Sequence, residues 1–519
     1  MGTPNLASII MDFHPTTTDD YHSLLLFLLP VFLTWMLLFK HHTRHHQKPS
    51  PAPLPPGPAP WPVVGNLFSL GPKPHKSLAQ IATTHGPIFS LRLGRRTTVV
   101  ISSASVAREV MLHHDAAFSG RSVQDTATVL GHYEASVAFM SPCPRWRFLR
   151  RMCASHVFAN SKLEAGRDMR RTKVGQLVSH IRNCSKSSKA INIGQVAFTT
   201  SLNVLSNTFF SKDMAHLNSE YGREFKELVW AMMVEVGTPN IVDFFPVLKV
   251  VDPQGARRRS TALTRKMFKI FDDIIDTRVN MRKASRSDDR DVLDCLLTIC
   301  EKDDSDFGRF DILHFLLDLF AAGTDTTSST VEWVMAELLH NPEKLKKAQA
   351  ELDEVVGKHN SLEEAHSSQL PYLQAIVKET LRIHPPVPFL VPRNVETDVE
   401  LCGYFIPKNS QVLVNVWAMG RDDKTWKNPD LFEPERFLGS TLDYKGHDFE
   451  LIPFGFGGRI CPGVPLASRV LMLVVGSLIH SFDWRLPDGT SLREMDMDDK
   501  FGFTLQKAQP LCIVPMIYK

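Results

Sequence analysis

Apolar residues recur at every third or fourth position along most of the chain, a spacing that places them on one face of an α-helix. Between the periodic segments lie charged or glycine-rich stretches that are typical of loops. The predicted helices span residues 75–86, 162–182, 220–236, 257–282, 291–300, 312–339, 342–356 and 466–480. The pattern therefore predicts a protein that is mostly helical.

Strand patterns are short and few. Residues 88–93 and 97–101 alternate or are rich in β-branched side chains, and the glycine and two arginines between them favour a turn, so this pair predicts a hairpin. Further strands are predicted at residues 399–406, 411–415 and 511–516. We therefore expect a mainly α fold with small β-sheets, built as one large domain.

An uncharged apolar stretch at residues 24–39 approaches the roughly 20 residues that span a bilayer. Acidic residues precede it, whereas Lys40, Arg44 and Lys48 follow it, which predicts that the rest of the chain is cytosolic. A cleaved signal peptide is the alternative, but it would carry its basic residues before the apolar stretch and small residues at its end. The pattern favours a single transmembrane anchor that is not cleaved.

A linker follows the predicted anchor. Eight prolines lie between Pro49 and Pro62, and such a run favours an extended polyproline II conformation over helix or strand. The predicted organisation has three parts. They are an N-terminal lumenal tail and anchor at residues 1–40, a basic and proline-rich linker at residues 41–62, and one large domain at residues 63–519.

Charge and cysteine content exclude some classes of function. A formal net charge of +3 is too small to indicate nucleic-acid binding, which calls for a concentrated basic stripe. The eight cysteines are scattered, without Cys-x-x-Cys pairs or zinc-ligand spacing. A disulfide framework is not expected in so long a chain. Most of these cysteines are therefore interpreted as buried free thiols, with Cys461 as the exception.

Cys461 lies in a segment, residues 454–463, that contains four glycines and leads into the predicted helix at 466–480. Such glycines allow positive φ angles and a close approach of the backbone to a flat group. The helix N-terminus and the backbone N–H groups stabilise a thiolate, and Arg459 adds a nearby cation. A thiolate in this position is a good ligand for haem iron. The pattern alone is equally compatible with a flexible loop that holds a buried cysteine.

This loop resembles the haem-binding loop of the cytochrome P-450 superfamily. The resemblance implies haem b as the cofactor, Cys461 as the axial ligand of its iron, and a monooxygenase that uses dioxygen. Similar plant enzymes usually have Arg where this chain has Gly458, which removes one basic contact but no ligand. The pattern F-x-x-G-x-R-x-C-x-G is matched at Phe454, Gly457, Arg459, Cys461 and Gly463.

A second motif, residues 322–327 (AGTDTT), interrupts the predicted apolar helix at 312–339. Glycine in a helix costs about 1 kcal/mol relative to alanine, and clustered threonines bond back to carbonyls and bend the helix. A weakened helix leaves room for a small ligand, although a buried helix with satisfied threonines is the plain alternative. The resemblance implies that Asp325 and Thr326 deliver protons to bound oxygen and that Ala322 contacts the haem.

Two further motifs lie on either side of a proline-rich loop. Glu379 and Arg382 are three residues apart on a predicted helix, and Arg436 lies in a Pro-Glu-Arg-Phe segment. A Glu-x-x-Arg pair alone occurs often by chance and contributes only about 0.2–0.5 kcal/mol on an exposed helix. The resemblance implies that the three side chains form a buried structural cluster.

Trp146 and Arg150 are one helical turn apart and fit the family pattern W-x-x-x-R. The resemblance implies that they, with Arg393 and Arg459, bind the haem propionates through charge-assisted hydrogen bonds. Each arginine taken alone is more simply a solvated surface charge. The resemblance also implies a substrate pocket that includes Phe320, Val387, Phe389, Val391 and Phe501.

The resemblance covers the whole chain and is closest to plant microsomal enzymes of the geraniol and terpenoid hydroxylase branch. It implies a single-pass protein of the endoplasmic reticulum membrane in contact with lipid. It also implies electrons from NADPH through a flavoprotein reductase, and hydroxylation of a small lipophilic metabolite, with a terpenoid as the expected substrate. An aromatic or alkaloid precursor is an alternative substrate. A haem-thiolate isomerase or dehydratase and a non-catalytic haem protein are alternative functions.

Overall fold

The computed structural model describes residues 52–518 apart from Asn218 and residues 285–290, 303–305 and 488–493. Contacts within the chain divide it into two units, Met1–Pro53 and Leu54–Lys519, and the second unit is described here. The predicted anchor and the first part of the predicted linker lie outside the described residues.

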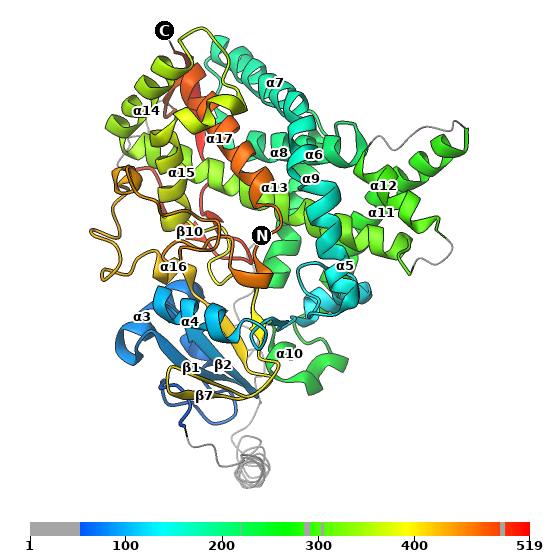
Figure 1. The fold of residues 1–519 in the computed structure, drawn as a ribbon, viewed down its shortest axis with the longest axis vertical. Coiled ribbons are helices and arrows are strands. Elements are labelled where there is room, and N and C mark those ends of the chain that lie inside the picture. Colours follow the sequence, from blue (N-terminus) through cyan, green and yellow to red (C-terminus); the bar gives the residue numbers. More distant parts are fainter. Residues whose placement is uncertain (1–51, 218, 285–290, 303–305, 488–493, 519) are drawn as a thin grey trace, which may run out of the picture. The chain divides into compact units, whose positions relative to one another are not determined.

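The second unit is mostly helical, with its largest sheet gathered at one end beside α3 and α4 (Figure 1). The predicted mainly α fold with small sheets is therefore confirmed. The helices are α3 Pro74–His85, α4 Ala104–His114, α5 Pro144–Met152, α6 Asn160–Ala165, α7 Arg167–Lys186, α8 Ile193–Phe210, α9 Glu220–Gly237, α10 Ile241–Phe244, α11 Ala256–Ala284, α12 Val292–Cys300, α13 Arg309–His340, α14 Pro342–Val355, α15 Pro371–Ile383, α16 Val416–Met419 and α17 Val464–Ser481.

The long helix α13 is the centre of the unit. It packs along α8 and also contacts α15 and α17. Sequence periodicity missed α8, because this helix is buried on nearly all its faces and therefore has no polar side to mark its period. Residues 162–182, predicted as one helix, form α6 and α7 with a break at Gly166. The other predicted helices begin and end within a few residues of those observed.

A five-stranded sheet has the strand order β1-β2-β8-β5-β3. The predicted hairpin is present as β1 Ile88–Leu93 and β2 Arg96–Ile101. Strand β2 pairs in parallel with β8 Gln411–Val414, and β5 Arg393–Asn394 joins β8 to β3 Gly120–Arg121. In the antiparallel register of β3 and β5, Arg121 lies directly opposite Arg393. The sheet therefore brings together two cations that are far apart in the sequence.

The smaller sheets are formed by strands from the last quarter of the chain together with β4. Residues 399–406, predicted as one strand, form a hairpin because Cys402 and Gly403 adopt positive φ angles of 51° and 78°. The remaining strands are β4 Ile191–Asn192, β6 Val399–Leu401, β7 Tyr404–Ile406, β9 Phe482–Arg485, β10 Asp499–Lys500, β11 Gln506–Lys507 and β12 Cys512–Ile517.

Residues 54–62, which belong to the predicted linker, lie along strand β1. The Ser90 backbone N–H donates to the Pro56 carbonyl at 2.7 Å, and the Ser90 hydroxyl donates to the Pro55 carbonyl at 2.7 Å. A Cβ at Gly57 would come within 1.9 Å of the Ser90 carbonyl oxygen, so only glycine permits this approach. This end of the proline-rich segment is thus attached to the sheet.

Helix α17 has a mean hydropathy of 1.6 over its 18 residues. Within the described part of the chain it is the one helix long and apolar enough to cross a bilayer. However, 72% of its residues are buried inside the protein, as expected for a core helix.

Candidate active site

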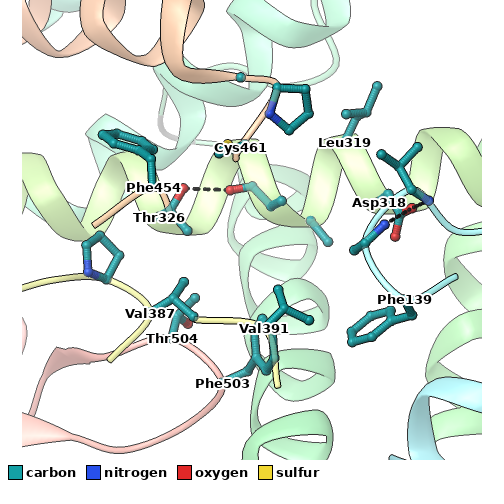
Figure 2. Close-up of a pocket in the computed structure, with 18 of the residues that line it drawn as sticks. Phe139, Asp318, Leu319, Thr326, Val387, Val391, Phe454, Cys461, Phe503 and Thr504 are labelled. Carbon is teal, nitrogen blue, oxygen red and sulfur yellow. Dashed lines mark hydrogen bonds between the residues drawn. The ribbon is translucent and has the colours of Figure 1, made fainter. Parts of the chain in front are cut away.

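A cavity of about 310 Å³ lies between α13, the segment around η2 Asp125–Glu134, and the loop that carries Cys461 (Figure 2). Its wall is mostly apolar. Helices α8 and α9 contribute Leu205 and Met233, the loop after α15 contributes Val387 and Val391, and the C-terminal segment contributes Phe503. The cavity therefore suits a small lipophilic molecule.

Cys461 lies between the short helix η7 Gly457–Arg459 and the N-terminus of α17, and it lines the cavity. Gly455 and Gly457 have φ angles of 76° and 64°, which are accessible to glycine without strain. Burial raises the pKa of the Cys461 thiol, while the backbone N–H of Gly463 and the guanidinium of Arg150 act in the opposite direction. The loop thus offers a thiol to the cavity with donors and a cation that favour the thiolate.

Four arginines, Arg121, Arg150, Arg393 and Arg459, line the same cavity. Burial lowers the pKa of Arg393 to about 10. Burial lowers that of Arg459 to about 9, and repulsion from Arg393 and Arg150 adds to the shift. In the described part of the chain, Asp115 is the one carboxylate that pairs with any of the four, 3.7 Å from Arg393. The cluster therefore carries positive charge that the described carboxylates leave largely uncompensated.

The hydrogen bonds of this cluster go to neutral carbonyls. Arg459 donates through Nε to the Ser119 carbonyl and through Nη2 to the Met140 carbonyl, each at 2.7 Å, while its buried Nη1 has no partner among the described residues. Arg150 donates to the Ile460 carbonyl at 2.9 Å. Such a cluster, with a free donor beside a thiol, fits a flat iron cofactor that carries two carboxylates. The residues present therefore fit haem, whose propionates would supply the missing negative charge.

Trp146 on α5 braces Arg459. Its ring centroid lies 4.1 Å from the Arg459 guanidinium, a cation–π distance. Its indole N–H donates to the Val137 carbonyl at 3.1 Å, so in this structure that donor is engaged by the backbone. Trp146 thus supports the arginine cluster mainly through its ring.

Thr326 and Asp325 on α13 point in different directions. Thr326 lines the cavity, and its hydroxyl donates to the Ala322 carbonyl at 2.6 Å (Figure 2). Asp325 is fully buried outside the cavity wall, where its carboxylate accepts hydrogen bonds from Thr504 and Gln506. Consecutive helical residues diverge by about 100°, which explains the separation. Burial raises the pKa of the Asp325 carboxyl.

A polar network joins α13 to the segment that follows η2. The Asp318 carboxylate accepts hydrogen bonds from the Ser136 hydroxyl at 2.9 Å and the Val137 N–H at 2.6 Å. The His132 Nε2 atom lies 3.2 Å from the same carboxylate, and its Nδ1 lies 2.9 Å from Nδ1 of His314. Burial lowers the pKa of His314 to about 3, so this ring is neutral. The network determines the shape of one cavity wall.

Glu379, Arg382 and Arg436 meet away from the cavity. Glu379 and Arg382 form two hydrogen bonds, at 2.7 and 2.8 Å, and Arg436 Nε donates to Glu379 at 3.0 Å. The side chains of Glu379 and Arg382 are fully buried. Arg382 also donates to the carbonyls of Gly420, Pro429 and Leu431, and so joins α15 to the long loop before η6 Pro434–Phe437.

Of the predicted pocket residues, Val387 and Val391 line the cavity, but Phe320, Phe389 and Phe501 do not. Phe320 packs in a stacked arrangement on Phe210, 5.3 Å between ring centroids, because it lies on the face of α13 that meets α8. Phe389 and Phe501 contact each other edge to face at 6.2 Å. Phe454, Gly463 and Ala322, which the sequence predicts as haem contacts, also line the cavity.

Among the further residues that line the cavity, the sequence predicted no haem contact for Arg121 and no role for Asp318 or Thr504. Arg121 is paired with Arg393 by strand register, which the local sequence does not reveal. In the sequence, Asp318 is an acidic residue within an apolar helical stretch. Such a pattern indicates a buried polar contact but no particular function. Thr504 lies in an irregular segment without any periodic pattern.

The model of the family described as Cytochrome P450 matches residues 55–512. The chain is 53% identical to a geraniol 8-hydroxylase of Swertia mussotii, over 88% of this chain and 92% of that protein. It is 49% identical to a geraniol 8-hydroxylase of Catharanthus roseus, over 96% and 99%. It is 48% identical to a drimenol monooxygenase of Persicaria hydropiper, over 95% and 96%.

This chain therefore belongs to the cytochrome P450 family. It is a haem-thiolate monooxygenase, as predicted, that takes electrons from a reductase and acts with dioxygen on a small substrate.

Proposed function

We propose that this monooxygenase hydroxylates a small terpenoid, most simply a terpenoid alcohol. The relatives named for geraniol and drimenol support this substrate class. The cavity supports it as well, because Val387, Val391 and Phe503 offer apolar contacts to a hydrocarbon chain. The single observation that carries the proposal is a thiol, Cys461, on the wall of an apolar cavity next to uncompensated arginines.

In this proposal the Cys461 sulfur would hold the haem iron. Arg121, Arg150, Arg393 and Arg459 bind the propionates, with Trp146 bracing Arg459. Ala322, Phe454 and Gly463 are the remaining haem contacts. Haem with a thiolate ligand supplies the reduction and cleavage of dioxygen, since thiolate ligation favours breaking of the O–O bond.

The protein contributes orientation and protons to this chemistry. Apolar side chains hold the substrate and exclude bulk water from the cavity. The Thr326 hydroxyl, now bonded to the Ala322 carbonyl, is available to donate into the cavity when that bond opens. Asp325 is the proton source in this proposal, because burial raises the pKa of its carboxyl and so favours the protonated form.

We place the protein on the endoplasmic reticulum membrane, with a single anchor in residues 1–40, a linker at 41–62 and the monooxygenase domain at 63–519 on the cytosolic side. The apolar stretch at 24–39 with basic residues after it supports the anchor. Exposed Val247, Val250 and Val251, which are 78%, 96% and 72% accessible, support a further contact of the domain with lipid.

NADPH is proposed as the electron source, through a flavoprotein reductase. A hollow of about 630 Å³ next to Cys461 is edged by Lys378, Lys445 and Arg469. Helix α5 adds further positive charge through the exposed side chains of Arg147 and Arg151. This basic surface suits an acidic reductase, because complementary charge steers association.

The test is the absorption spectrum of the reduced, carbon-monoxide-bound protein for wild type and Cys461→Ser, followed by turnover with NADPH, a reductase and oxygen. We expect a thiolate-type Soret band in wild type that is absent from the variant. Oxygen-dependent hydroxylation of geraniol or drimenol is expected for wild type alone. Exclusive turnover of aromatic or alkaloid precursors would refute the terpenoid assignment. A thiolate-type band in the variant would refute the assignment of Cys461.

A further inference from the structure

Asp325 is hydrogen-bonded to a hydroxyl group, but that hydroxyl belongs to Thr504 and not to its neighbour Thr326. The Thr504 hydroxyl donates to Oδ2 of Asp325, and the Gln506 side-chain amide donates to Oδ1. Thr326 instead donates back to the Ala322 carbonyl. The two residues of α13 that the motif predicts to act together are therefore not in contact in this structure.

Thr504 separates Asp325 from the cavity. Asp325 is completely buried and does not line the cavity, whereas Thr504 does (Figure 2). Gln506, on the other oxygen, has only amide protons to offer and cannot pass on a carboxyl proton as a hydroxyl can. Among the described hydrogen bonds, the Thr504 hydroxyl is therefore the one connection between the Asp325 carboxyl and a residue of the cavity wall.

Hydrogen bonds along one side of α13 fix the C-terminal segment that carries Thr504. The Ser329 hydroxyl donates to the Leu505 carbonyl at 2.7 Å, and the Leu511 N–H donates to Glu332 at 2.8 Å. The Leu505 N–H donates to the Pro386 carbonyl at 2.7 Å, in the loop that also forms the cavity wall. Contacts on both sides of Thr504 thus position its hydroxyl between helix and cavity.

We propose that Thr504 is a proton-relay residue, whose hydroxyl passes the proton of Asp325 into the cavity. A hydroxyl donates one hydrogen bond and accepts two, so it can receive a proton on one side as it releases its own on the other. The inference rests on the proposed function, because it supplies the protons that oxygen cleavage consumes.

The step is balanced in protons and involves no electrons. The O–H bond of the Asp325 carboxylic acid breaks, and its proton bonds to Oγ1 of Thr504. The former Thr504 hydroxyl proton leaves to a water molecule on the cavity side. Asp325 is then a carboxylate that accepts a hydrogen bond from the Thr504 hydroxyl. Water that enters the cavity after product release returns a proton to Asp325 through the same Thr504 hydroxyl.

The test compares three haem-loaded variants with wild type. Thr504→Val keeps the shape of the side chain and removes the hydroxyl, whereas Thr504→Ser keeps the hydroxyl. The control is Thr324→Val. Thr324 is a buried threonine next to Asp325 whose hydroxyl, among the described contacts, bonds only to the Phe320 carbonyl, at 2.7 Å, and it does not line the cavity. The carbon-monoxide spectrum of each variant establishes that it has folded and bound haem.

The first readout is coupling, measured as product and hydrogen peroxide formed per NADPH consumed, with geraniol as the probe or drimenol if geraniol is not hydroxylated. We expect Thr504→Val to lose about tenfold in product per NADPH and to release peroxide instead. Thr504→Ser and Thr324→Val should remain within about twofold of wild type. The geraniol dissociation constant from the substrate-induced spectral shift should change less than threefold in Thr504→Val.

The second readout does not depend on turnover. The infrared carbonyl band of protonated Asp325, assigned with Asp325→Asn, should shift in Thr504→Val and keep its position in Thr324→Val. Unchanged coupling in Thr504→Val would refute the relay, and so would a coupling loss that serine does not rescue. If wild type consumes no oxygen, the proposed function fails as well. In that case an unshifted infrared band would separately refute Thr504 as the partner of Asp325.

Discussion

Both oxygens of the Asp318 carboxylate lie 2.9 Å from the Ser136 hydroxyl, which joins the middle of α13 to a segment 182 residues earlier in the chain. The next two residues, Val137 and Ala138, donate their backbone N–H groups to the same carboxylate. The carbonyls of Val137 and Ala138 in turn accept hydrogen bonds from Trp146 and Arg121. The Asp318 carboxylate thus orders the backbone of residues 136–138, to which two residues of the proposed haem site are hydrogen-bonded.

Asp318→Ala should therefore weaken haem binding as well as stability. Removing the carboxylate leaves buried N–H and hydroxyl donors without an acceptor, and each such donor costs about 1–3 kcal/mol. We expect the free energy of unfolding to fall by about 3 kcal/mol or more, and haem transfer to apomyoglobin to become about tenfold faster. Urea titration and the change in the Soret band measure the two effects.

Asp311→Ala is the matched control, since Asp311 is a buried carboxylate on the same helix that pairs with Arg145 outside the 132–140 segment. It should lower stability without accelerating haem loss. Equal rates of haem loss in the two variants would contradict the ordering role of Asp318.

Arg121→Leu tests the residue that strand pairing adds to the haem site. Arg121 is partly buried opposite Arg393 and donates to the Ala138 and Val391 carbonyls at 2.9 and 2.8 Å. A hydrogen bond to a charged group contributes about 1.5–3 kcal/mol, so haem affinity should fall by roughly 10- to 100-fold. Titration of the apoprotein with haem measures this affinity. The exposed Arg147 serves as control, and an affinity loss in Arg147→Leu of the same size would point to a general charge effect.

Although Arg121→Leu should weaken haem binding, we do not expect it to destabilise the apoprotein. Without haem, Arg121 is repelled by Arg459, Arg393 and Arg150, and burial together with this repulsion lowers its pKa well below the ordinary value. Removing it should therefore stabilise the apoprotein or leave its midpoint of urea unfolding unchanged. A large loss of apoprotein stability would mean that its backbone hydrogen bonds outweigh the repulsion.

Glu379→Gln should destabilise the fold without any direct effect on the cavity. The change leaves the buried guanidinium of Arg382 without its counter-charge, and breaking one partner of a buried pair costs about 3–5 kcal/mol. Glu433→Gln is the control, because Glu433 pairs with the same Arg436 at 3.3 Å but is 36% exposed, and an exposed pair contributes about 0–1 kcal/mol. Thermal denaturation followed at the Soret band should separate the two variants clearly. Similar midpoints would argue against a buried pair.

We expect the Asp243 carboxyl to make a pH-dependent contribution to the free energy of unfolding. Burial raises the pKa of its carboxyl from 3.8 to about 6, while the Asp125 N–H and the Arg96 guanidinium act in the opposite direction. Since the folded state holds this proton more tightly, the contribution is full below pH 3.8 and is lost as the pH rises through about 6.

Asp243→Asn removes this pH dependence. At pH 8 the variant should be more stable than wild type by about 2–3 kcal/mol, because each pKa unit corresponds to about 1.4 kcal/mol. At pH 4 the difference should be below about 1 kcal/mol. Urea unfolding at both pH values measures the gap. A gap that does not change with pH would show that the substitution acts through the Asp125 hydrogen bond and not through charge.

Local patterns anticipated much of the fold. The helical periods of α9, α11 and α13 and the hairpin of β1 and β2 are visible in the sequence, because each element buries one face or carries its own turn signal. Helix α8 was missed because it is buried all round. Gly166, which ends α6, was overlooked within a continuous apolar period.

For the site, the sequence by itself determined the residues whose spacing is local. Cys461 in its glycine-rich loop and Glu379 three residues before Arg382 follow from short motifs, since the chemistry of each depends on neighbours within one turn or loop. Which residues face the cavity depends instead on how distant segments pack. Only the tertiary structure placed Thr504 beside Asp325, 179 residues away, and turned Phe320 towards α8 and away from the cavity. Rotation about a helix axis and strand register are decided by contacts between elements, which a local pattern does not contain.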